Sequence, residues 1–132
     1  MRPKAVVLLT LVLAFVSVAD AAGPCPLMLI SGTAESDAIV VTFRHGGKVP
    51  IRQFEFNCIP LRSQAHTPQN GRCREDNALF YPGGEYTARY TYPGGKREPV
   101  RVSVKSVTFL DGTIWRPTKR QPCRVLSIRV PK

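Results

Sequence analysis

Hydrophobic and polar residues alternate along several short stretches of this chain, which is the pattern of β-strands. Residues Ala38–Arg44 are rich in β-branched side chains and end at a His-Gly-Gly-Lys turn. Ile51–Cys58 places aromatic residues on one face and polar residues on the other, and Glu85–Tyr92 alternates in the same way. Because successive side chains of a strand point to opposite faces, each stretch has one face suited to a core.

Residues 100–110 continue the alternation, but its parity reverses midway. An extra residue in one strand has this effect, so the pattern predicts a β-bulge near Lys105-Ser106. Asp111-Gly112 follows between two apolar stretches and predicts a hairpin. We expect a two-residue type I′ turn there, which needs a positive φ at both residues.

Two further segments complete the predicted fold. Leu27–Ser31 is a short apolar opening segment, and Arg124–Val130 supplies a final alternating strand. Twelve prolines and ten glycines divide the chain into short pieces, and no helical period is sustained after the N-terminal segment. The sequence therefore predicts an all-β sandwich, immunoglobulin-like or fibronectin type III-like, of about seven short strands.

The segment Pro60–Asn77 departs from this alternation. It holds few apolar residues and combines Gln, His, Pro, Asn and Gly with two cysteines. This composition predicts a long surface loop pinned at Cys58 and Cys73, and long ordered loops often carry binding residues. His66 in this loop is a candidate binding residue, and the alternative is a decorated turn without a role.

The N-terminal residues 1–21 have the features of a cleavable secretory signal. Two basic residues precede the uncharged stretch Ala5–Val18, and Ala19-Asp20-Ala21 supplies the small residues of a cleavage site. A stretch of that length spans about 21 Å, short of the roughly 30 Å hydrocarbon core, so no transmembrane segment is expected in the mature chain. A lipoprotein signal fits less well because Pro24 precedes Cys25. We expect one domain, residues 22–132, in a secreted or periplasmic protein.

All four cysteines, Cys25, Cys58, Cys73 and Cys123, lie in the mature part. An even number of cysteines in a small exported domain predicts two disulfides. Of the three pairings we favour Cys58–Cys73, which closes a short loop, with Cys25–Cys123, which ties the start of the domain to its last strand. A zinc site is not expected because no C-x-x-C pair is present and neither histidine has a second ligand at suitable spacing.

The charge balance favours contact with anionic surfaces. Without residues 1–21 the chain has seventeen basic and eight acidic residues, a net charge of +9. Arg89, Arg101 and Lys105 on outer strand faces are candidate binding residues for an anionic envelope polymer, and the alternative is a solubilising surface. Nucleic acid is not expected, because basic and aromatic residues do not interleave along a strand face.

Catalytic chemistry has little support in the sequence. The two histidines lie in turn or loop sequence, and neither a Gly-x-Ser-x-Gly elbow nor a His-Glu-x-x-His motif is present. Glu75-Asp76 is the only adjacent acidic pair in the mature part. We therefore expect no catalytic residues, no metal and no cofactor.

Two motifs resemble known exported domains. Phe80-Tyr81-Pro82-Gly83-Gly84-Glu85-Tyr86 resembles the stretch that leads into the tyrosine corner of fibronectin type III domains, which implies that the Tyr86 hydroxyl bonds to upstream backbone at a crossing between sheets. Val107–Trp115 resembles the V-x-F-x-D-G-T-x-W hairpin of small exported bacterial immunoglobulin-like domains of uncharacterised function. The resemblance implies a fold and a compartment and carries no catalytic residues.

The same motif bears on the function of Trp115. This residue could form a sugar-stacking platform with Tyr81, Tyr90 and Tyr92, but its place in the motif favours packing against the core, with Asp111 and Gly112 as turn residues. We expect a non-enzymatic exported binding or structural module whose partner is an anionic envelope polymer or another exported protein. The alternative is a small exported hydrolase or inhibitor that acts through Pro60–Asn77.

Overall fold

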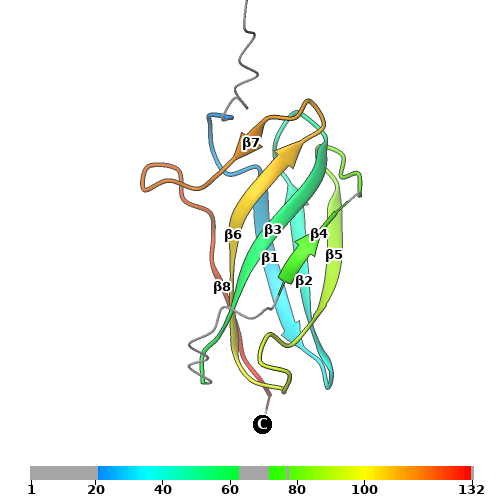
Figure 1. Cartoon of the computed structure of the whole chain (residues 1–132), viewed down its shortest axis with the longest axis vertical. Helices are drawn as coiled ribbons and strands as arrows, with labels where there is room; N and C mark the ends of the chain where they lie inside the picture. The colour runs from blue at the N-terminus through cyan, green and yellow to red at the C-terminus, as the bar shows by residue number, and fades with distance from the viewer. Residues whose placement is uncertain (1–20, 63–71, 77, 132) are drawn as a thin grey trace, which may run out of the picture.

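The computed structural model describes residues 21–62, 72–76 and 78–131 (Figure 1). These residues form β-strands and connecting loops. The strands are β1 (Leu27–Ala34), β2 (Ala38–His45), β3 (Ile51–Pro60), β4 (Arg72–Glu75), β5 (Glu85–Thr91), β6 (Val100–Phe109), β7 (Ile114–Trp115) and β8 (Leu126–Ile128).

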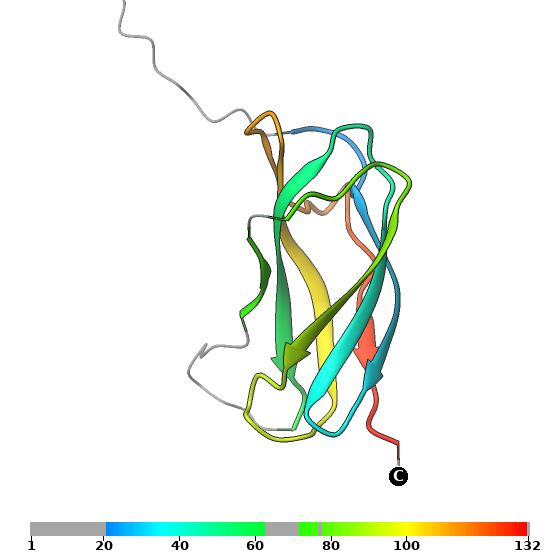
Figure 2. The same cartoon turned by 90° about the vertical axis from the view of Figure 1, so that its right-hand side faces the viewer.

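The strands form two antiparallel sheets that face each other as a sandwich, as the two views in Figure 1 and Figure 2 show. One sheet has the order β1-β2-β5. The other has the order β4-β3-β6, and both β7 and β8 pair with β6. The prediction of an all-β sandwich is confirmed, with about eight strands in the described residues where the sequence predicted about seven.

Aromatic side chains from both sheets fill the centre of the core. The ring of Phe43 in β2 packs against those of Phe54, Phe56 and Phe80, with ring centroids 5.0, 5.8 and 5.7 Å away. All four side chains are buried, and such edge-to-face contacts add about 0.5–1.5 kcal/mol each beyond the burial of apolar area. The inward positions are those that the alternation of the sequence selected.

Strand β8 closes one side of the sandwich by packing against β1. A Cβ atom at Gly32 of β1 would lie only 2.5 Å from Cγ1 of Ile128, so glycine is required for this close approach. Ile128 itself is buried. The C-terminal part of the chain is thus held against both sheets.

The predicted bulge lies in β6 where the parity changes. Glu55 of β3 pairs with Ser106, but the next residue, Phe56, pairs with Val104, so Lys105 has no partner residue in the ladder. This confirms the bulge near Lys105-Ser106. The extra residue lets Val104 and Val107 both point into the core, where both are buried.

The prediction of one long loop at Pro60–Asn77 was wrong in part. Strand β3 continues to Pro60, and Arg72–Glu75 forms the edge strand β4 against residues 54–57 of β3. Cys73 is buried within this pairing, so the segment contributes to the core as well as to the surface. Residues 63–71 and 77, which include His66, lie outside the described residues.

The hairpin between β6 and β7 also differs from the prediction. The N–H of Gly112 donates to the carbonyl of Phe109 at 3.0 Å, and the N–H of Phe109 donates to the carbonyl of Thr113 at 2.9 Å. These bonds define a three-residue loop, in which a tight turn is followed by a glycine with φ of +88°. Positive φ is therefore required at Gly112, and the two-residue type I′ turn was a wrong prediction.

Replacing Gly112 with valine should lower the free energy of unfolding by about 1–3 kcal/mol, measured by urea denaturation. The cost comes from the backbone conformation alone, because a Cβ atom at this position would meet nothing within 4 Å. Gly112→Asn is the matched control and should lose less, since asparagine tolerates the left-handed region. Equal losses for the two variants would contradict this explanation.

Two disulfides join Cys25 to Cys123 and Cys58 to Cys73, which is the pairing that the sequence favoured. Such bonds persist in oxidising compartments, so the disulfides indicate an extracytoplasmic location. The predicted signal segment, apart from Ala21, lies outside the described residues. Within the described part of the chain, no helix has the length and apolar character needed to cross a bilayer.

Candidate functional site

The three basic residues predicted for binding lie on two different sheets. Arg89 is on the outer face of β5, whereas Arg101 and Lys105 are on the outer face of β6 in the opposite sheet. The structure therefore does not bring these three cations together on one surface.

The charges of two of these residues are balanced by nearby carboxylates. The guanidinium of Arg89 donates to Glu35 and, at 2.7 Å, to Asp37, both in the turn between β1 and β2. Lys105 Nζ lies 3.4 Å from Glu55 Oε1 on the neighbouring strand. Arg101 is exposed and has no ion pair among the described residues, so it is the predicted cation that stays available.

The aromatic residues do not form a stacking platform. Trp115 is only 2% exposed, and Tyr90 and Tyr92 are also buried. Tyr81 is exposed, but it lies in the loop before β5. A stacking platform needs exposed ring faces, so the burial of Trp115 supports the interpretation that this residue packs against the core.

Tyr86 forms the hydrogen bond that the motif implied, although at a different crossing between sheets. Its hydroxyl accepts from the N–H of Tyr81 at 2.7 Å, and its ring packs so closely on Gly84 that a Cβ there would lie 2.5 Å from the hydroxyl oxygen. In immunoglobulin-like domains the tyrosine corner precedes the sixth strand of the sandwich. Here Tyr86 is the second residue of β5, an edge strand of the three-stranded sheet, so the likeness to the corner is local.

The described histidine, His45, supports a turn. Its ring is buried, and Nδ1 accepts from the N–H of Gly47 at 3.0 Å. Nε2 therefore carries the proton and donates to the carbonyl of Val49 at 2.7 Å. Both ring nitrogens are used to hold the turn between β2 and β3.

The acid and phenol groups with shifted pKa values have structural explanations. The pKa of Asp111 is lowered because its carboxylate accepts from the hydroxyl and the backbone N–H of Thr113, at 2.7 and 3.0 Å. Burial raises the pKa of the Tyr90 hydroxyl, and the charge of Glu75 adds to the effect. Among the described residues, no group of three or more His, Cys, Asp or Glu side chains is arranged to hold a metal ion.

The C-terminal part of the chain concentrates positive charge. From Gly112 to Lys132 the sequence has six basic residues and no acidic residue. Lys119, Arg120, Arg124 and Arg129 are exposed and have no ion pair among the described residues. We refer to these four residues together with Arg101, which pairs with Ser127 of β8, as the basic edge.

Three of these cations lie in the loop Arg116–Val125, which we call the basic loop. It leaves the sandwich after β7 and returns at β8, and Figure 1 shows it projecting from the side of the sheets. Thr118 and Gln121 exchange backbone hydrogen bonds at 3.2 Å in both directions, which places Lys119 and Arg120 at the tip of a tight hairpin.

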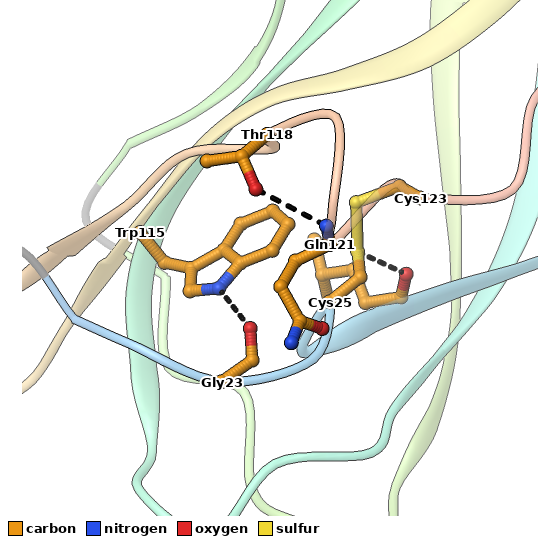
Figure 3. The surroundings of a disulfide bond; sticks show 7 residues. Gly23, Cys25, Trp115, Thr118, Gln121 and Cys123 are labelled. Carbon is orange, nitrogen blue, oxygen red and sulfur yellow. Dashed lines mark hydrogen bonds between the residues drawn. A yellow bond between two sulfur atoms is a disulfide. The ribbon is translucent and has the colours of Figure 1, made fainter.

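The base of the basic loop is fixed by covalent and packing contacts. Cys123 is joined to Cys25, and the side chain of Thr118 accepts from the N–H of Gln121 at 3.1 Å. At the other end Trp115 donates from Nε1 to the carbonyl of Gly23 at 3.0 Å (Figure 3). A loop held in this way loses little conformational entropy when it binds, which favours affinity.

Sequence reasoning found Arg101 but missed the other four residues of the basic edge, although a signal was available. The basic residues were counted over the whole mature chain, where they look evenly spread. A count by segment would have found six cations without an acid after Asp111. That Lys119 and Arg120 share a hairpin tip follows from backbone pairing, which no spacing in the sequence indicates.

Comparisons with known proteins add no family. A scan against protein-family models finds no match, and a search of curated proteins finds no similar sequence. The fold and the charge distribution therefore carry the functional argument.

Proposed function

We propose that this chain is a non-enzymatic exported binding module, secreted or periplasmic, that holds an anionic polymer outside the cytoplasm through its basic edge. Its sandwich would belong with the immunoglobulin-like or fibronectin type III-like domains that the hairpin motif resembles. The chain would use the sandwich as a rigid support and the basic loop as the contact.

The observation that carries the proposal is the segment after Asp111, which has six basic residues and no acidic residue and which supplies four of the five cations of the basic edge. Arg89 and Lys105 each lie beside a carboxylate, whereas the cations of the basic edge have no carboxylate partner within the described part of the chain. Unbalanced charges of one sign on a shared surface attract polyanions and raise their rate of association. A paired arginine contributes much less to such a field.

The other partners considered for this chain have weaker support. Single-stranded nucleic acid is usually held by aromatic side chains that interleave with cations. Among the described residues the exposed aromatic side chain is Tyr81, at 58%, and it lies in the β4–β5 loop, outside the basic edge. An acidic exported protein is the other anionic partner considered, and the experiment below favours it if the parent protein binds no polysaccharide. The hydrolase or inhibitor alternative rests on Pro60–Asn77, most of which lies outside the described residues.

Reversing three charges of the basic loop should weaken polyanion binding strongly. We expect the variant Lys119→Glu, Arg120→Glu, Arg124→Glu to bind polygalacturonate or dextran sulfate on the order of a hundredfold more weakly at low salt, since each cation near an anionic surface contributes about 1 kcal/mol. Calorimetric titration and elution from an anionic column in a salt gradient would measure the change.

The matched control is the variant Arg44→Glu, Lys48→Glu, Arg52→Glu at and beside the turn between β2 and β3. These three residues are exposed, and the control changes the net charge by the same amount. If the control weakens binding as much as the loop variant does, net charge alone explains the attraction and the basic edge is not the site. Absence of polyanion binding by the parent protein would refute the proposed function.

A further inference from the structure

A cleft lies at the end of the sandwich where the turn between β1 and β2 meets the loop between β5 and β6. Figure 1 shows both connections at the lower end of the molecule. The cleft has a volume of about 460 Å³ and is open to solvent, since every lining residue except Tyr92 is exposed. It is lined by Gly95 and by the polar residues Ser36, Asp37, Thr91, Tyr92, Lys96 and Arg97.

The charge of the cleft is positive. Lys96 and Arg97 are exposed and have no ion pair in the described part of the chain. The single carboxylate in the lining, that of Asp37, lies 2.7 Å from a guanidinium nitrogen of Arg89, and it shares this guanidinium with Glu35. An anion in the cleft would therefore meet two cations without an ion pair among the described residues, and the one negative charge that Arg89 leaves unbalanced on Glu35 and Asp37.

The walls of the cleft are connected to each other. The buried Tyr92 donates its hydroxyl proton to the backbone carbonyl of Glu35, which joins the β5–β6 loop to the β1–β2 turn. The loop itself is tightened where the N–H of Gly95 donates to the carbonyl of Tyr92 at 2.9 Å, a turn that uses a φ of +77° at Gly95. These two bonds fix the backbone of the lining before a ligand binds.

The lining also offers hydroxyl and carboxylate groups beside the two cations. Ser36 and Thr91 can each donate and accept a hydrogen bond, and Asp37 keeps acceptor capacity beyond its contact with Arg89. An acidic sugar is a ligand that carries several hydroxyl groups beside a carboxylate. Lys96 and Arg97 suit the carboxylate, while Ser36, Asp37 and Thr91 suit the sugar hydroxyls.

The cleft also lies near one end of the basic edge, where β6 begins and β8 ends. Arg101 follows the β5–β6 loop by a few residues at the start of β6, and Val100 pairs with Ile128, the residue before Arg129. A chain of acidic sugars that left the cleft would therefore reach Arg101 and Arg129 first, and the basic loop after them.

We propose that this cleft binds one uronic acid unit of an acidic polysaccharide, with Lys96 and Arg97 holding its carboxylate. The inference rests on the proposed function, because it names the polymer class and adds a specific subsite to the basic edge. The basic edge then supplies attraction along the polymer, and the cleft supplies recognition of the sugar.

The test uses the oxidised protein and trigalacturonic acid, a probe short enough to occupy the cleft without covering the basic loop. We expect the parent protein to bind it in calorimetric titration. The variant Lys96→Gln, Arg97→Gln should bind roughly a hundredfold more weakly, since each lost bond between charged groups costs about tenfold. Thr91→Val should weaken binding several-fold, and Lys48→Gln, Arg52→Gln should bind like the parent.

A second measurement locates the ligand and separates the two proposals. Amide chemical shifts of Thr91, Tyr92 and Gly95 should move on addition of the trisaccharide. If only amides of the basic loop move, the cleft is refuted while the proposed function stands. If vesicles of anionic phospholipid bind the parent and no saccharide does, the polysaccharide class is refuted in favour of a membrane surface. If no anionic probe binds, both proposals fall together.

Discussion

Trp115→Ala should lower the free energy of unfolding by about 3–5 kcal/mol, the usual cost of removing a large aromatic side chain from a core. Trp115 is the largest fully buried side chain of the described residues, and its Nε1–H donates a hydrogen bond to the carbonyl of Gly23. The loss is a large share of the 5–15 kcal/mol that stabilises a typical domain. We expect the melting temperature to fall by roughly 10–20 °C in calorimetry.

Two further variants test whether packing is the reason. Trp115→Phe keeps most of the apolar volume but loses the hydrogen bond to Gly23, so it should lose less stability than Trp115→Ala. Tyr81→Ala removes an exposed ring and should melt within a few degrees of the parent. If Trp115→Ala melts like the parent but no longer binds a saccharide, the residue is a ligand contact and the packing explanation is wrong.

The strands that were predicted correctly are those whose inward-facing residues are mostly apolar. In β2, and in β6 on either side of its bulge, every second residue is buried, so the two-residue period of the sequence matches the two-residue period of the sheet. The bulge at Lys105 could be predicted for the same reason, because an inserted residue changes the parity of that period.

Strand β4 could not be predicted in this way, because its sequence Arg-Cys-Arg-Glu is mostly charged. It is a strand because Cys73 is tied to Cys58 and because residues 54–57 of β3 offer free backbone groups for pairing. Both causes act through tertiary structure. A strand at the edge of a sheet commonly carries charged residues, so it lacks the alternation of apolar and polar residues by which strands are predicted.

The hairpin at Asp111-Gly112 shows a limit of another kind. The dipeptide indicates a turn, but it fits both a two-residue loop and a three-residue loop that ends in glycine. The choice depends on which residues pair across the turn, here Phe109 with Thr113. The position of the turn was therefore predictable, and its type was not.

The candidate site was harder to predict than the fold. Whether an arginine is free depends on its neighbours in space, and Arg89 is neutralised by Glu35, which is 54 residues away in the sequence. In the sequence, Lys96 and Arg97 have the pattern of ordinary turn residues. Only the folded structure shows that the β1–β2 turn lies beside them and forms a cleft with them. Charge pairing and clefts are properties of the folded chain, so the sequence could indicate an anionic partner but not its site.

Removal of the Cys25–Cys123 disulfide should have the other large effect on stability. The two residues are 98 apart in sequence, and in the loop-entropy model a crosslink of this span stabilises by about 4.7 kcal/mol, against about 3 kcal/mol for the 15-residue span of Cys58–Cys73. We expect Cys25→Ala, Cys123→Ala to lose about 4–5 kcal/mol in urea denaturation, the greater loss of the two double variants.

Two further effects bear on the relative stability of the two double variants. Cys58 and Cys73 are more deeply buried than Cys25 and Cys123, so replacing them with alanine also loses packing. This loss reduces the expected difference in unfolding free energy between the two variants by about 1 kcal/mol. Of the two disulfides, Cys25–Cys123 is the one attached to the basic loop. Its removal should therefore also weaken polygalacturonate binding, measured at a temperature where both variants are folded. Unchanged binding in that variant would mean that the hairpin of Thr118 and Gln121 and the packing of Trp115 are enough to hold the loop. A greater loss of stability in the Cys58→Ala, Cys73→Ala variant would show that burial outweighs loop entropy in this fold.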